Sequence, residues 1–322
     1  MVDSPGRITL WGIEVFMAAA DERSISAAAK RLGASPSAVS QQLTNLEAAV
    51  GAMLLQRNAR PVRLTPAGEI LKRRAQGILN EAAQARAELA MSDLSTLTRF
   101  RLGMIEDFEA DVTPQLLTHM AGELKGSQFL LETGASHTLY ELLEARNLDV
   151  IVAADLGTED DWVEVHPLLE ERFIVAAPKN VLDQSGDVMA QLKRLPLIQY
   201  TQRHYMGRLI TAHLVRQNIS LPHRFELDSY HAILALVGQG AGWSILTPLA
   251  LMRGQRFADQ IDVMALPLAP LSRMISLPAR KGILQEMPAQ VASPLRPNLK
   301  RTVLDPAIDA YPFLKDQIEL HP

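Results

Sequence analysis

The chain has 322 residues, of which 48% are apolar and 21% charged, so it is long enough for two or three domains that each bury a core. It contains no cysteine, which excludes disulfide frameworks, catalytic thiols and cysteine-ligated metal centres, and is typical of a reducing compartment such as the cytoplasm. The formal net charge of −4, taken alone, argues against a nucleic-acid partner.

No segment predicts a membrane span or an export signal. No run reaches the roughly 18 consecutive apolar residues that a membrane span needs. Residues 8–20 follow Arg7 and end in three alanines, as a signal peptide does, but Glu14 interrupts the apolar run and the apolar side chains recur at helical spacing. We therefore expect an amphipathic helix at residues 8–21, a cytoplasmic protein and no membrane partner.

The charge is unevenly distributed along the chain. Residues 24–74 hold eight cations and two anions, a net of +6, so the other residues carry a net of −10. A basic module on an acidic body is typical of a nucleic-acid-binding protein, although an ordinary solvated basic face shows the same bias. The eight cations are Lys30, Arg31, Arg57, Arg60, Arg63, Lys72, Arg73 and Arg74.

Two short helices joined by a tight turn are predicted within this basic module. Residues 27–32 form an alanine-rich helix that ends at Gly33, and Ser35 and Pro36 are the N-cap and first turn of a helix that continues to Val50. This is a helix-turn-helix pattern, in which polar side chains of the second helix meet base edges and hydroxyls meet phosphates. The expected DNA contacts are Ser24, Ser26, Ser35, Pro36, Ser37, Ser40, Gln41, Thr44 and Asn45.

A short positive stretch at residues 54–64 predicts a hairpin, the wing of a winged helix-turn-helix domain. Its arginines are suited to follow a phosphate backbone or to enter a minor groove. We therefore add Arg57, Arg60 and Arg63 to the expected DNA contacts.

Residues 66–92 predict one long helix, capped by Thr65. Six apolar residues are spaced by four, three, four, three and four positions, which is the seam of a coiled coil and favours dimerisation. The alternative is that this face packs on its own domain. Residues 92–98 are polar and predict a hinge. The seam consists of Leu71, Ala75, Ile78, Ala82, Ala85 and Leu89.

From residue 99 the pattern alternates strand and helix, which predicts an α/β domain with a parallel sheet. Enzyme motifs are incomplete there. Residues 238–243 lack the third glycine of a dinucleotide fingerprint, residues 134–137 lack the second glycine of a nucleophile elbow, and no second histidine joins His137 and Glu141 in a metal site. We expect no catalytic residue, no metal and no cofactor.

These motifs resemble the LysR-type transcriptional regulators. Pro36 stands where many members carry glutamine and Gln41 where many carry arginine or lysine, which leaves the base contacts open, since glutamine pairs best with adenine and arginine with guanine. The resemblance rests on residues 24–29, Leu32, residues 35–40, Leu43, Leu46, Glu47, Leu54, Leu55, Arg57 and residues 64–68, and further on Thr133, Gly134, Ser136, Leu139, Leu142, Leu143, Leu148, Asp149, residues 238–242 and Pro248.

The resemblance implies an effector domain similar to periplasmic binding proteins, with two α/β lobes around a cleft at the carboxyl ends of strands. Ser136 is alternatively an N-cap, and Glu106 and Asp107 a solvated loop; if either carboxylate faces the cleft, it favours a cationic or hydroxylated effector. Arg203 and His204 could bind an anion, but adjacent side chains usually point apart, so both are expected at the solvated surface. The candidate effector contacts are Ile105, Glu106, Asp107, Gly134, Ala135, Ser136, Tyr200, Thr201, Gln202 and Ser229.

The expected architecture is therefore mixed α+β and α/β. A winged helix-turn-helix at residues 1–65 is followed by a linker helix and hinge at 66–98 and an effector domain at 99–322. Lobe I comprises about 99–161 and 266–287, lobe II about 162–265, and a C-terminal extension about 289–322, whose prolines are expected to break any long helix.

The resemblance further implies promoter DNA, a small-molecule effector, RNA polymerase and a second copy of the chain as partners, in a homodimer or homotetramer. Two other functions stay open. One is a solute-binding module whose helical head binds protein, and the other is an enzyme on a binding-protein scaffold.

Overall fold

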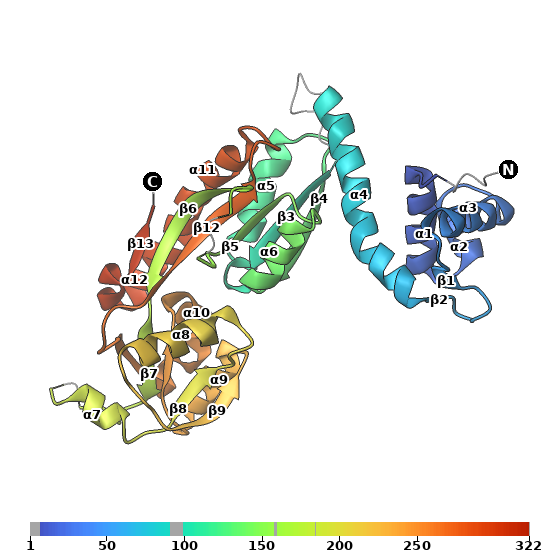
Figure 1. Ribbon diagram of the computed structural model, residues 1–322. Coiled ribbons are helices and arrows are strands. Elements are labelled where there is room, and N and C mark those ends of the chain that lie inside the picture. Colours follow the sequence, from blue (N-terminus) through green and yellow to red (C-terminus); the bar gives the residue numbers. More distant parts are fainter. Residues whose placement is uncertain (1–6, 91–98, 158–159, 184, 322) are drawn as a thin grey trace. The chain divides into compact units, whose positions relative to one another are not determined.

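The computed structural model describes residues 7–90, 99–157, 160–183 and 185–321. The chain divides into two compact units, a first that includes residues 7–90 and a second that includes most of the chain from residue 99 onward (Figure 1). Among the described helices, none combines the length and apolar character needed to cross a bilayer. Each unit is described by itself below.

The N-terminal unit is a helical module with a two-stranded wing, as predicted. Thr9, Ser24 and Ser35 cap the first three helices, each accepting a hydrogen bond from the backbone N–H three residues ahead. Gly33 has φ +64°, the left-handed conformation that ends a helix at glycine. Its elements are α1 (Leu10–Glu22), α2 (Ile25–Arg31), α3 (Pro36–Val50), β1 (Leu55–Gln56), β2 (Arg63–Leu64) and α4 (Pro66–Ala90).

One apolar core holds this unit together. On α3 the side chains of Val39, Leu43 and Leu46 are at most 2% exposed, and the intervening polar residues are left outside. Phe16 of α1 and Ala75 of α4 are fully buried in the same core. The helix period of the sequence therefore fixes which face of α3 packs inward and which face is offered to a partner.

The second unit contains two lobes. The sheet of lobe I has the strand order β13-β6-β12-β5-β3-β4, with β3 parallel to β4 and β5, and β12 antiparallel to β5 and β6. Its elements are β3 (Arg99–Ile105), η2 (Glu106–Phe108), α5 (Thr113–Glu123), β4 (Gln128–Gly134), α6 (Ser136–Glu144), β5 (Val150–Ala154), β6 (Val163–Arg172) and β12 (Ser272–Arg280), together with the C-terminal elements given below.

Lobe II is built around β7, which pairs with β10 and β11 in antiparallel fashion. A parallel pair, β8 and β9, joins β10 through a bridge between Leu197 and Trp243. Its elements are β7 (Ile174–Pro178), α7 (Val188–Leu192), β8 (Leu197–Tyr200), α8 (Tyr205–Arg216), β9 (His223–Leu227), α9 (Tyr230–Gly238), β10 (Ser244–Leu246), α10 (Pro248–Arg253), η3 (Gln255–Gln260) and β11 (Ile261–Ala265).

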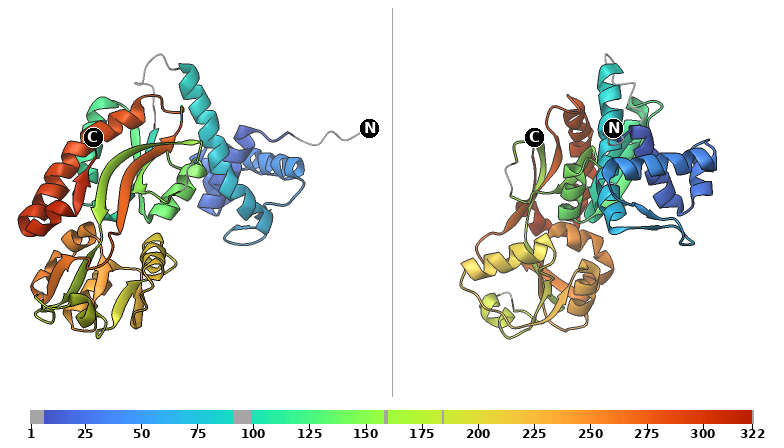
Figure 2. Two further views of the ribbon diagram at one scale, coloured as in Figure 1. Left: turned by 60° about the vertical axis from the view of Figure 1, so that its left-hand side comes forward. Right: turned by 45° about the vertical axis from the view of Figure 1, so that its right-hand side comes forward.

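Two adjacent strands connect the lobes. β6 leads directly into β7, and β12 returns the chain from β11, so that β6 and β12 lie side by side at the crossing (Figure 2). The sequence reading placed the start of lobe II at residue 162. The structure differs, because residues 163–172 form β6 and pair with β12 in the sheet of lobe I. This strand is only partly buried, so its sequence indicates only weakly to which lobe it belongs.

The C-terminal extension corrects the expectation that its prolines exclude a long helix. Pro288 lies in the first turn of α11, where its missing N–H is not needed, while Pro294 and Pro297 lie inside this 13-residue helix. Burial of a leucine, valine or methionine contributes about 1.5–3 kcal/mol, so four such side chains together offset a penalty of about 3 kcal/mol for each of the two interior prolines. These are Met287, Val291, Leu295 and Leu299 of the buried face. The elements are α11 (Met287–Leu299), η4 (Lys300–Leu304), α12 (Asp305–Ala310), η5 (Pro312–Asp316) and β13 (Ile318–Leu320).

Candidate functional site

The polar face of α3 lies at the surface of the N-terminal unit. Gln41 donates from Nε2 to Oδ1 of Asn45 at 2.9 Å, so the two amides are held side by side. The Thr44 hydroxyl donates to the carbonyl of Ser40 at 3.0 Å. Among the sequence-predicted contacts of this module, Ser24 and Ser40 are half-buried, and the exposed ones are Ser26, Ser35, Pro36, Ser37, Gln41, Thr44 and Asn45.

Arg57 has a different environment from the other two predicted wing arginines. Its guanidinium pairs with the buried carboxylate of Glu47 and donates to the Thr44 hydroxyl at 3.1 Å. The other oxygen of Glu47 accepts hydrogen bonds from the backbone N–H groups of Leu54 and Leu55 at 2.8 and 3.2 Å. Arg57 therefore braces the start of the wing against α3, which the sequence reading did not foresee.

Arg60 and Arg63 lie on the exposed part of the wing. In the part of the chain that the structure describes, neither pairs with a carboxylate. Long cationic side chains that are unpaired at a surface are suited to contact phosphates. The wing therefore carries two cations available to an anionic partner and one that is used internally.

The predicted coiled-coil seam divides between two environments. Ala75 is fully buried and Leu71 half-buried against the core of the same unit, so the alternative of packing on its own domain holds for this first part. Ile78 and Ala85 are exposed and Ala82 half-buried. The side chain of Leu89 and the predicted hinge at residues 92–98 lie outside the described residues.

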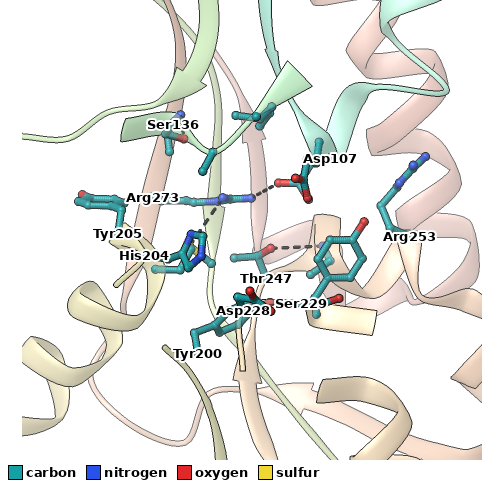
Figure 3. A pocket seen from close by; sticks show the side chains of 18 of the residues that line it. Asp107, Ser136, Tyr200, His204, Tyr205, Asp228, Ser229, Thr247, Arg253 and Arg273 are labelled. Carbon is teal, nitrogen blue, oxygen red and sulfur yellow. Dashed lines mark hydrogen bonds and ion pairs between the residues drawn. The ribbon is translucent and has the colours of Figure 1, made fainter. Parts of the chain in front are cut away.

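A cavity of about 690 Å³ lies between the two lobes of the second unit (Figure 3). Such a volume suits a small organic molecule. Its walls come from the ends of β3 and β4 in lobe I, from the loop before α9 in lobe II and from β12. Eight predicted effector contacts line it, namely Ile105, Glu106, Asp107, Gly134, Ala135, Ser136, Tyr200 and Ser229.

Thr201 and Gln202 are absent from the described cavity lining, contrary to expectation. The backbone N–H of Gln202 donates to Oε1 of Glu226 at 2.8 Å, and the Thr201 side chain bonds to the same carboxylate. These bonds hold the pKa of Glu226 below its usual range. The loop after β8 is therefore used to join β8 to β9, its neighbour in the sheet.

Ser136 opens α6 and serves the scaffold as well as the cavity. Its hydroxyl accepts a hydrogen bond at 3.0 Å from the backbone N–H of Ala154, at the end of β5. The side chain thus links the start of α6, which follows β4, to the end of β5 across the intervening strand β3, while the residue also lines the cavity. It is half-buried, so part of it faces the cavity.

The floor of the cavity contains a buried arginine that sequence reasoning missed. Arg273 on β12 pairs with Glu171 on β6 at 2.6 Å and with Asp107 of η2 at 2.7 Å. The second oxygen of Glu171 accepts from the backbone N–H of Leu249 in α10 at 3.0 Å. This triad of Arg273, Glu171 and Asp107 thus joins both connecting strands to elements of both lobes.

Burial dominates the electrostatics of the triad. It raises the pKa of the fully buried Glu171 carboxyl, and the adjacent Arg273 opposes that shift. Burial by itself would lower the pKa of Arg273, but the carboxylates of Glu171 and Asp107 raise it. A charged residue within an apolar strand run, such as Arg273 between Leu271 and Leu277, is the sequence signal that could have found this site.

Aromatic rings complete the cavity. Tyr200, Tyr205 and Tyr230 line it from lobe II, together with His204, whose ring meets that of His137 from lobe I at 5.7 Å between centroids. His204 was expected at the solvated surface and instead lines the cavity. Burial raises the pKa of the tyrosine hydroxyls, so the phenols stay neutral. Among the described residues no three histidine, aspartate or glutamate side chains are grouped so that they could hold a metal ion.

A winged helix-turn-helix joined to a two-lobed domain with a central cavity defines a DNA-binding, ligand-responsive regulator as the class of protein. The LysR substrate binding domain matches residues 95–291, and the lysR family of bacterial regulatory helix-turn-helix proteins matches residues 10–69. The first match covers more than half of the chain. The chain therefore belongs to the LysR family of transcriptional regulators.

Curated relatives carry regulator names. A probable hydrogen peroxide-inducible genes activator of Mycobacterium avium is 32% identical over 196 residues, which span 61% of this chain and 61% of that protein. The HTH-type transcriptional regulator PcaQ of Agrobacterium fabrum is 26% identical over 233 residues, which span 71% of this chain and 74% of PcaQ. The chain thus spans less than two thirds of the first of these two relatives and about three quarters of the second.

Solved structures share the fold. A full-length OxyR variant from Pseudomonas aeruginosa has a TM-score of 0.67 at 22% identity, covering 92% of this chain and 96% of its own. CbnR, a LysR family transcriptional regulator, has a TM-score of 0.60 at 20% identity, covering 90% of this chain and 99% of its own. Both similarities extend over the DNA-binding module and the two-lobed domain.

Proposed function

We propose that the chain binds promoter DNA in a sequence-specific manner and that a small molecule in the cavity of the second unit controls this binding. The observation that supports the proposal is the free polar face of α3 on a chain that also encloses a cavity of about 690 Å³. A ligand shifts such a system only by binding one arrangement of the protein more tightly than another.

In this proposal the DNA contacts have three roles. Pro36, Ser37, Gln41 and Asn45 meet base edges in a major groove, because they lie on the exposed face of α3. The hydroxyls of Ser24, Ser26, Ser35, Ser40 and Thr44, together with Arg60 and Arg63, meet phosphates. Arg57 acts by holding α3 and the wing together, since its guanidinium already pairs with Glu47.

We infer further partners from the same geometry. A homodimer or homotetramer would present two recognition helices to a pseudo-palindromic site, with α4 as the contact between copies. RNA polymerase would be affected through the placement of this assembly at a promoter. The proposed domain limits are a winged helix-turn-helix to residue 65, a linker to 98 and an effector domain beyond, and the proposed location is the cytoplasm. We propose no catalytic activity.

We do not infer the identity of the effector from the relatives. One relative's name refers to hydrogen peroxide, but this chain contains no cysteine, so oxidation of a thiol cannot report peroxide here. The shared folds at 20–22% identity carry no ligand information. The chemistry of the cavity itself is the better guide.

Selection of duplexes from a random library with the full chain tests the DNA-binding part. We expect enrichment of a two-fold symmetric motif, with affinity falling steeply as salt rises. Arg63→Ala should weaken binding to every sequence. A library that stays random after repeated selection would contradict the proposal and favour a head that binds protein instead.

A further inference from the structure

Both arginines of the cavity are already neutralised by the protein. Arg273 pairs with Glu171 and Asp107, as described above. Arg253 of α10 pairs with Asp111 at 3.0 Å, and the Tyr230 hydroxyl shares this arginine. An effector carboxylate would therefore have to compete with protein carboxylates that are already in place.

The carboxylates of the cavity are in excess. Two carboxylates against one guanidinium leave the buried triad with a formal charge of −1. Glu106, Glu109 and Asp228 also line the cavity, and no described cation lies within ion-pair distance of any of them. With the three lining histidines counted as neutral, the lining therefore carries a net negative formal charge. The share of the triad is buried and weakly screened, whereas Glu106, Glu109 and Asp228 are exposed to solvent.

The negative groups belong to both lobes. Glu106, Asp107 and Glu109 follow β3 in lobe I, whereas Asp228 precedes α9 in lobe II. Figure 3 shows Asp107 and Asp228 at the same cavity, with Arg273 reaching Asp107. Like charges on facing lobes repel, so a cation between them would favour closure of the cleft.

Neutral aromatic rings add to this preference. Tyr200, Tyr205 and Tyr230 line the cavity, and Tyr200 is only 6% exposed. The face of a phenol ring attracts a cation, most strongly where water is excluded. Acidic groups combined with phenol rings are the surroundings that organic ammonium ions prefer.

We propose that the effector is an organic cation, an amine or quaternary ammonium compound, bound between the acidic end of β3 and Asp228 against the tyrosine rings. This rests on the proposed function, in which the cavity holds the effector. A neutral hydroxylated compound is the other effector class that the acidic groups admit, and the experiment separates the two.

The test uses two sets of probes that differ in charge on a common skeleton. Phenylethylamine, phenylethanol and phenylpropanoate form one set, and putrescine, butanediol and succinate the other. Binding to the full chain is followed by calorimetry and by thermal shift, since a ligand of the folded state raises the melting temperature. We expect an amine to bind about tenfold more tightly than its alcohol, with no binding of the carboxylate.

Three variants locate the binding. Asp107→Asn and Asp228→Asn should each abolish the preference for the amine, whereas Asp309→Asn, which removes an exposed carboxylate on α12, should preserve it. Asp228 takes part in no ion pair in the described residues, so its variant tests the site without disturbing the triad.

Two results would contradict a cationic effector. One is an alcohol or a carboxylate that binds as tightly as the matching amine, and the other is the failure of both amines to bind. The selection of DNA duplexes from the random library is carried out separately, with the same protein and without any probe. It therefore shows whether a failure concerns the effector class or the regulatory function itself.

Discussion

Arg273 and Glu171 face each other in register on the antiparallel strands β12 and β6, and their side chains form a buried ion pair at 2.6 Å. Because these two strands connect the lobes, the pair lies at the hinge of the effector domain. It is tied to lobe II through Leu249 and to lobe I through Asp107. Arg273 thus contributes both to the charge of the cavity and to the connection between the two lobes.

Breaking this pair from one side should be costly. Arg273→Met leaves the Glu171 carboxylate buried without its cation, and we expect a loss of about 3–5 kcal/mol in the free energy of unfolding. The measurement is urea denaturation of the second unit within the full chain. Adding Glu171→Gln should recover more than half of the loss, because the amide oxygen can still accept from Leu249. An additive double variant would contradict a specific pair.

The two kinds of wing arginine should respond differently to removal. Arg57→Ala leaves the buried Glu47 unpaired, so it should destabilise the N-terminal unit by about 2 kcal/mol and weaken DNA binding through misplaced α3. Arg63→Ala should leave stability unchanged and reduce the slope of log affinity against log salt by about one. Melting curves and salt titrations distinguish the two, and equal effects on stability would contradict the assignment.

We expect the Gln41 side chain to contact a base edge and to contribute to sequence preference. Gln41→Ala removes the amide that is held beside Asn45, and we expect sequence preference at one position of each half-site to fall by about 1–3 kcal/mol. Selection from a random library measures this preference. Gln76→Ala on α4, which breaks a similar pair with Asn80 at 3.0 Å, is the matched control and should leave the preference unchanged.

We expect acid to weaken the contacts that the Asp262 carboxylate makes in lobe II. Burial acts to raise the pKa of Asp262, but hydrogen bonds from Lys179 and from the backbone N–H of Asn180 at 2.7 Å lower it overall. A carboxyl whose folded pKa lies below its unfolded value stabilises above the unfolded pKa, near 4, and loses this effect as pH falls through the folded value. Asp262→Ala should therefore destabilise at pH 7, and its effect should shrink as the pH falls through the lowered folded pKa of Asp262.

The sequence predicted the helical module well because its signals are local. The N-cap at Ser35, the helix end at Gly33 and the apolar period of α3 depend on a few neighbouring residues, and each of these predictions was confirmed. The strands of lobe I up to β5 were also predicted, since their residues alternate with helices in a regular order.

Long-range relationships were beyond the sequence reading. The partnership of Glu171 and Arg273 depends on the register of two strands that lie about a hundred residues apart in the chain. The helix α11 forms despite Pro294 and Pro297 because tertiary burial exceeds the local penalty. Thr201 was expected at the cavity because it follows a strand, but its hydrogen bond to Glu226 directs it elsewhere. In each case a distant partner decided the outcome.

The exposed part of the α4 face provides the last test, that of assembly. Ile78 is 40% exposed and belongs to the predicted seam, whereas Ile70 is 58% exposed and lies off it. A charge placed in a coiled-coil seam is buried on association and opposes it. Ile78→Glu should therefore shift the chain toward monomer in light scattering after size exclusion, and Ile70→Glu should leave the assembly intact. The reverse pattern would move the contact between copies to another face of α4.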